Sequence, residues 1–156
     1  MKRLNILVDF DGTCIFQLPE PGHCGEDTCA GKVLRELQKY HNIYLWTARN
    51  HNPKNPYNWI NGKPRDIDSL DQAIRWFENE GIKLSGINDM ENNLCKSRKI
   101  HGDLLIDDIS VGIPKIWKTI KFYSYVDDKW KYVDTFCVDW ETLWKNHLKA
   151  LCMEST

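Results

Sequence analysis

The sequence lacks the long apolar run that a membrane-spanning helix requires, since no stretch approaches about 18 consecutive apolar residues. It also lacks an excess of charge of either sign, because 21 Lys and Arg stand against 22 Asp and Glu. No basic field is therefore available to attract nucleic acid, and a nucleic-acid partner is not favoured, although it is left open. The N-terminal apolar stretch is too short for a signal peptide, so we expect a cytoplasmic protein without a membrane partner.

Cysteine and histidine pairs at zinc-ligand spacing are missing as well. The six Cys lie at positions 14, 24, 29, 95, 137 and 152, and no Cys-x-x-Cys pair occurs among them. His23, Cys24 and Cys29 resemble half of a zinc site that nothing else in the sequence completes. The cysteines therefore predict unpaired thiols in a reducing compartment. The seven Trp and six Tyr are expected in packing rather than in a base-stacking platform.

Short apolar strands and amphipathic helices alternate along the chain. This order predicts an α/β fold, in which right-handed crossovers build a doubly wound, Rossmann-like parallel sheet within a single domain, residues 1–156. Strands are expected at residues 4–8, 43–47, 82–87 and 104–106, and helices over 33–40 and from 66 to about 80. The C-terminal part predicts a short helix opening at Pro114, a hairpin over 121–133 and a last helix capped by Asp139.

Polar side chains follow the predicted strands at the point where each strand ends. Asp9, Thr47 and the pair Asp107-Asp108 all come directly after apolar stretches. In a doubly wound sheet, ligands bind beyond the carboxyl ends of the strands, so these side chains should converge. Gly12 then suggests a sharp turn of the chain just after Asp11.

Four carboxylates at one edge of a sheet repel one another unless a divalent cation lies among them. Ligand sets made only of oxygen favour Mg²⁺, which commonly binds a substrate phosphate as well. A carboxylate can attack phosphorus itself, and its neighbour Asp11 can serve as general acid and base. Thr47 and either Lys99 or Lys96 offer donors for the phosphoryl oxygens.

Four segments resemble, in order, the motifs of the haloacid dehalogenase-like phosphohydrolases. They are DFDGT at 9–13, the strand ending in Thr47, a Lys upstream of the last strand, and LLIDD at 104–108. The resemblance covers residues 3 to about 114 and implies a three-layer fold with a minimal cap. It implies that Asp9 is the nucleophile and Asp11 the general acid/base. Mg²⁺ would be held by Asp9, the backbone carbonyl of Asp11, and Asp107 with or without Asp108, and the phosphoryl group by Thr47 and Lys99. An Asp at position 11 favours phosphate-ester hydrolysis in this superfamily.

Within the superfamily, residues 97–114 are similar to a group of short, nearly capless bacterial and phage members, and more distantly to the 5′(3′)-deoxyribonucleotidases. The register of this segment favours Lys99 over Lys96 as the phosphate-binding lysine. Those relatives usually carry Arg directly after the Asp pair, where this chain has Ile109. Residues 115–156 match nothing in the resemblance.

The expected substrate is a small phosphorylated molecule. Residues 14–27 leave room for a short flap, residues 50–65 form a long loop near the site, and Gly12, Thr13 and Arg49 are the expected substrate contacts. We expect a Mg²⁺-dependent phosphomonoester hydrolase, with a nucleoside monophosphate favoured over a sugar phosphate or a polynucleotide 3′-phosphate. An inactive phosphate-binding module and a phosphorylated receiver domain are the other readings of these residues. The sequence predicts no oligomeric state.

Overall fold

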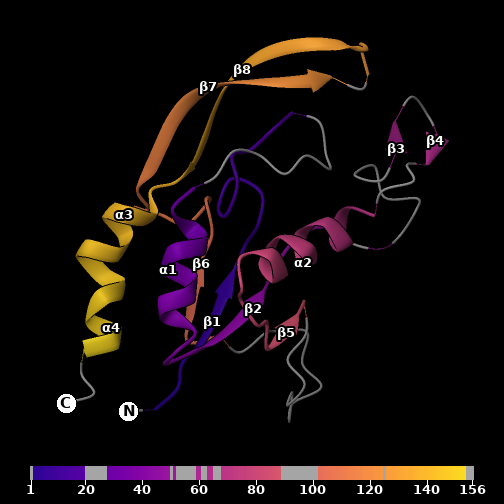
Figure 1. Cartoon of the computed structure of the whole chain (residues 1–156). Helices are drawn as coiled ribbons and strands as arrows, with labels where there is room; N and C mark the ends of the chain where they lie inside the picture. Colours follow the sequence, from indigo (N-terminus) through magenta and orange to yellow (C-terminus); the bar gives the residue numbers. More distant parts are fainter. Residues whose placement is uncertain are drawn as a thin grey trace.

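The computed structural model describes residues 2–19, 28–49, 51, 59–60, 63–64, 68–88, 102–124 and 126–153. A parallel sheet of four strands, in the order β5-β2-β1-β6, lies at its centre (Figure 1). The strands are β1 (Asn5–Val8), β2 (Asn42–Leu45), β5 (Gly86–Ile87) and β6 (Leu104–Ile106). Parallel strands joined by helices confirm the predicted α/β fold.

β1 is an inner strand of the sheet, and its register fixes where the site is built. It pairs with β2 on one side and with β6 on the other, so that Val8 lies opposite both Leu45 and Ile106. All three side chains are buried. Because the three strands end level with one another, the residues that follow them emerge at the same edge of the sheet.

Two amphipathic helices connect these strands. α1 (Ala30–Leu37) buries Val33, Leu34 and Leu37, and α2 (Ser69–Asn79) buries Leu70, Ala73 and Phe77. The carboxylate of Asp68 caps α2 by accepting hydrogen bonds from two backbone N–H groups, so the helix begins later than the predicted residue 66. The helix expected to reach Tyr40 ends at Leu37, and the strand expected over 82–87 is formed only by its last two residues.

The C-terminal hairpin is longer than predicted. β7 (Lys115–Ser124) and β8 (Lys129–Val138) pair antiparallel along their whole length, and they extend away from the sheet at the top of Figure 1. The short helix predicted at Pro114 is wrong, because β7 begins at the next residue. At the start of β7 the lysines and the apolar residues do not alternate strictly. The two-residue period of a strand therefore could not be recognised there from the sequence.

The helical segments at the C-terminus pack against the turn that follows β1. Helix α3 (Trp140–Leu143), a π-helical segment (Trp144–Leu148) and α4 (Lys149–Met153) follow the hairpin. Asp139 caps this helix, as predicted, by accepting from the N–H of Thr142 (3.0 Å). The indole N–H of buried Trp140 donates to the carbonyl of Thr13 (2.7 Å), which ties the C-terminal helix to the turn after β1.

Two short strands, β3 (Trp59–Ile60) and β4 (Lys63–Pro64), form a separate antiparallel pair. Among the residues that the structure describes, no helix has the length and apolar character to cross a bilayer.

Candidate active site

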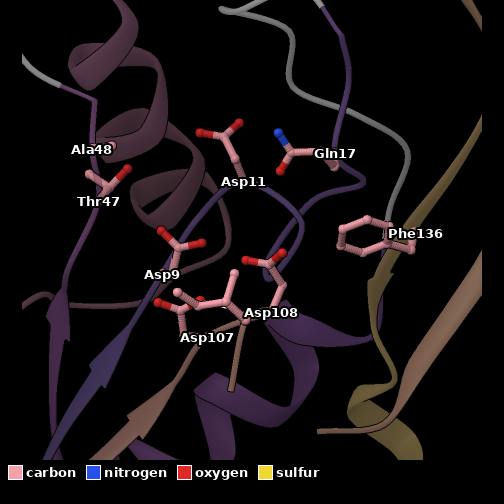
Figure 2. A pocket seen from close by; sticks show the side chains of 9 residues that line it. Asp9, Asp11, Gln17, Thr47, Ala48, Asp107, Asp108 and Phe136 are labelled. Carbon is pink, nitrogen blue, oxygen red and sulfur yellow. Dashed lines mark hydrogen bonds between the residues drawn. The ribbon is translucent and has the colours of Figure 1, made fainter. Parts of the chain in front are cut away.

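A pocket of about 400 Å³ opens at the carboxyl edge of the sheet (Figure 2). It collects side chains that are far apart in the sequence, because three strands end together there. Five of the residues predicted for the site line it, and four further residues complete the wall. The predicted ones are Asp9, Asp11, Thr47, Asp107 and Asp108, and the others are Gln17, Ala48, Ile109 and Phe136.

Three carboxylates form the floor of this pocket. Asp9, Asp107 and Asp108 each offer an oxygen within 4.8 Å of the other two. Burial first of all, together with the nearby charges of Asp107 and Asp11, raises the pKa of Asp9 to about 7. Burial, followed by the charge of Asp107, also raises the pKa of Asp108. The cluster therefore concentrates negative charge that a bound cation would neutralise.

A tight turn after β1 holds two of these carboxylates in place. Gly12 has a φ of +75°, and the N–H groups of Thr13 and Cys14 donate to the carbonyl of Phe10. The buried Thr13 hydroxyl donates to Asp9 Oδ2 (3.2 Å) and accepts from the N–H of Asp108 (3.0 Å). Neither Gly12 nor Thr13, both predicted as substrate contacts, lines the pocket. They position the carboxylates from beneath.

Replacing Gly12 with Ala should weaken divalent-cation binding and destabilise the fold. A Cβ at Gly12 would lie 3.1 Å from Asp108 Cγ, so that carboxylate must move, and the positive φ costs about 1–2 kcal/mol. Gly112→Ala is the matched control, because Gly112 has a φ of +77° and nothing within 4 Å of its Cβ position. Calorimetric titration with Mg²⁺ should show several-fold weaker binding for Gly12→Ala only. Equal affinities in the two variants would contradict this role.

Arg49 contacts Asp11 instead of facing the pocket. Its Nε and Nη2 donate to the two Asp11 oxygens (2.8 and 2.7 Å), and its Nη1 donates to the Ser69 carbonyl (3.1 Å). The guanidinium also lies over the ring of Phe10, 4.6 Å from its centroid, and its side chain is 1% exposed. Arg49 was predicted as a substrate contact, but in this structure it fixes the orientation of Asp11.

Thr47 reaches the pocket from the end of β2. Its N–H donates to Asn88 Oδ1 (2.8 Å), and its hydroxyl accepts from the N–H of Arg49 (3.2 Å). Both predicted phosphate-binding lysines, Lys99 and its alternative Lys96, lie outside the described residues. The same holds for residues 20–27 of the predicted flap and for most of the loop predicted over 50–65.

Sequence reasoning missed the side of the pocket that faces the hairpin. Phe136 of β8 and Gln17 lie across from the carboxylates in Figure 2, and the Gln17 N–H donates to the Phe136 carbonyl (3.0 Å). The charge of Lys115 lies near enough to Asp108 to offset part of the rise in the pKa of that carboxyl. None of the three belongs to a recognisable motif.

The metal-free protein should lose stability as pH rises from about 4 to 7. The folded-state pKa of Asp9 lies above its unfolded value, so the folded state holds a proton in this window that the unfolded state has lost. Thermal unfolding in EDTA should therefore show Tm falling over that range. In the same window Mg²⁺ affinity should rise with pH, because the cation competes with the Asp9 proton. The Asp9→Asn variant should lack most of this pH dependence, and an unchanged dependence would contradict the assignment.

Comparisons with known proteins identify one informative relative. No model of a known protein family matches the chain, and no curated protein does. A solved structure from Bacteroides thetaiotaomicron, described as a conserved protein coded by a locus, shares 30% identity and a TM-score of 0.54. The match covers 71% of this chain and 80% of that chain. It supports the α/β fold, and its description names no activity.

Proposed function

We propose that this chain, which belongs to the same family as the conserved Bacteroides thetaiotaomicron protein, is a divalent-cation-dependent phosphomonoester hydrolase. The observation that carries the proposal is the convergence of Asp9, Asp107 and Asp108 within 4.8 Å at the ends of two neighbouring parallel strands, β1 and β6. Asp11 and Thr47 line the same pocket. This placement agrees with the resemblance to haloacid dehalogenase-like phosphohydrolases, and a three-layer, doubly wound arrangement with a minimal cap is part of the proposal.

The donor set fits Mg²⁺. The three clustered groups offer only carboxylate oxygens, which hard cations prefer, and their partial burial makes an uncompensated charge costly. Asp9, Asp107 and Asp108 would hold the ion, with the backbone carbonyl of Asp11 as a further ligand. When bound, Mg²⁺ neutralises charge on the cluster and on the substrate phosphate.

Asp9 is the nucleophile in the proposed reaction. One of its carboxylate oxygens attacks phosphorus, the ester P–O bond breaks, and the leaving alkoxide takes a proton from Asp11. Asp11 then removes a proton from water, whose oxygen attacks phosphorus. The bond between phosphorus and Asp9 breaks, which releases inorganic phosphate and restores both carboxyl groups.

Two contacts support these roles. The hydroxyl of Thr13 holds Asp9 Oδ2, which fixes the carboxylate for attack. The bidentate contact with Arg49 fixes Asp11 above Asp9 in Figure 2, and one of its two hydrogen bonds must break before an Asp11 oxygen can carry the proton that it donates. The hydroxyl of Thr47, which lines the pocket, is a donor available to the phosphoryl oxygens.

The test is phosphate release from nucleoside monophosphates, sugar phosphates and 3′-phosphorylated oligonucleotides, with Mg²⁺ or with EDTA. We expect release with Mg²⁺, loss of release with EDTA, and inhibition by beryllofluoride, which mimics the phosphoryl group on a carboxylate. Binding of Mg²⁺ and beryllofluoride without release from any substrate would overturn the proposal in favour of a non-catalytic phosphate-binding module.

A further inference from the structure

The β7–β8 hairpin has two faces of different character. One face is largely buried, with Ile120, Phe122 and Cys137 each less than a tenth exposed. The strand register places a second set of side chains on the opposite face, where rings alternate with cations. We call this surface the aromatic face, and it consists of Lys115, Trp117, Lys121, Trp130, Tyr132 and Phe136.

The rings of the aromatic face are open to solvent far beyond what packing requires. Trp117, Trp130 and Tyr132 are 67%, 61% and 72% exposed. Each end of the face also pairs a cation with a ring: Lys115 Nζ lies 4.5 Å from the centroid of Phe136, and Lys121 Nζ lies 5.0 Å from that of Trp130. The one acid on this face, Asp134, accepts from the Thr119 hydroxyl (2.6 Å).

The aromatic face is continuous with the candidate active site. Phe136 lines the pocket, and its ring packs against Trp117 at 5.0 Å between centroids. Lys115, at the same end, lies close enough to Asp108 for its charge to act on that carboxylate. From Phe136 the face runs along β8 to Trp130, a distance of about 20 Å for six residues of strand. A ligand seated at the carboxylates can therefore extend onto the rings.

We propose that the aromatic face binds a single-stranded nucleic acid whose terminal phosphate monoester enters the carboxylate pocket. This inference rests on the proposed function and names its substrate class. Unpaired bases stack on exposed aromatic rings whatever their sequence, and nearby cations contact the phosphates between them. The aromatic face offers rings for base stacking and lysines for phosphate contacts, and it leads to the proposed phosphate-cleaving site.

Local charge supports this occupant although the whole chain is close to neutral. The aromatic face carries Lys115 and Lys121 against the single acid Asp134, whereas the whole chain has a formal charge of −1; the other three lysines of the hairpin lie on its opposite face. A free nucleoside monophosphate in the pocket would reach Phe136 but not Trp130 or Tyr132, so it leaves most of the aromatic face unexplained. A duplex would keep its bases stacked away from the rings, which favours a single strand.

The test compares kcat/KM for p-nitrophenyl phosphate, a nucleoside 3′-monophosphate, and single-stranded DNA and RNA oligomers of about eight nucleotides. The oligomers carry the phosphate at either the 3′ or the 5′ end. We expect an oligomer to exceed the mononucleotide by about ten-fold or more, with a KM that rises with salt. Trp130→Ala and Tyr132→Ala should each lower the ratio of oligomer to p-nitrophenyl phosphate hydrolysis by about ten-fold, through KM. Tyr40→Ala, at an exposed Tyr elsewhere on the surface, is the matched control and should leave the ratio unchanged.

Binding of the same oligomers, followed by fluorescence anisotropy, separates this inference from the proposed function. Binding that Trp130→Ala weakens, without hydrolysis of any phosphate, would support the docking surface and overturn the hydrolase. Hydrolysis of p-nitrophenyl phosphate with no preference for oligomers would overturn the docking surface alone. A preference for a phosphopeptide over every oligomer would also overturn it, in favour of a protein substrate.

Discussion

Asp9→Asn should abolish phosphate release, with kcat lowered by about 10⁴-fold or more. An amide cannot form the proposed covalent bond to phosphorus, and it replaces a charged ligand of the cation site. Thr13 can still donate to the side-chain oxygen of Asn, so the turn after β1 should keep its shape. Steady-state phosphate release at saturating Mg²⁺ measures the effect.

The fold of the Asp9→Asn variant is checked separately. Because an ionised Asp9 is costly to bury, the variant should unfold about 5 °C higher than the native chain in EDTA at pH 8. Asp71→Asn, at a half-exposed carboxylate on α2, should keep full activity as the matched control. Residual activity within about ten-fold of the native chain would rule out Asp9 as the nucleophile.

Arg49→Ala should cost about 3 kcal/mol of unfolding free energy, a fall in Tm of about 10 °C. The substitution removes a buried guanidinium that joins Asp11, the Ser69 carbonyl at the start of α2, and the ring of Phe10. It also releases Asp11, so kcat should fall while KM changes little. Chemical denaturation and steady-state kinetics measure the two effects.

Two further variants separate the causes of that loss. Arg49→Lys keeps the charge but not the bidentate geometry, so it should recover part of the stability and little of kcat. Arg75→Ala removes an exposed Arg from α2 and should change neither quantity by much. A native-like kcat for Arg49→Ala would show that Asp11 needs no positioning by Arg49.

The site could be predicted largely from the sequence because its residues follow the ends of apolar strands. Asp9, Asp107 and Thr47 each come one or two residues after a strand of the central sheet, and a parallel sheet brings such positions to one edge. No knowledge of the packing around them was needed. The prediction that these side chains converge is confirmed, whereas their chemistry remains a proposal.

The role of Arg49 was beyond the sequence because it depends on a contact across 38 positions with Asp11. A cation two residues after Thr47 can face a ligand or a neighbouring carboxylate, and composition does not distinguish the two. Arg49 contacts Asp11 because the fold places the end of β2 beside the turn after β1. Thr13 is a similar case, since its hydroxyl is used beneath the pocket rather than within it.

The sequence by itself determined the α/β fold, the turn after β1, and the strand ends at which the carboxylates gather, because each depends on local periodicity and on the level ends of parallel strands. Only the tertiary structure shows that the β7–β8 hairpin forms one wall of the pocket. The docking of the hairpin brings Phe136 into the pocket and Lys115 near Asp108, and the strand register gathers the exposed rings of the aromatic face on one side. Packing between residues far apart in the sequence sets that docking, whereas the register of the hairpin follows from its turn and its local alternation.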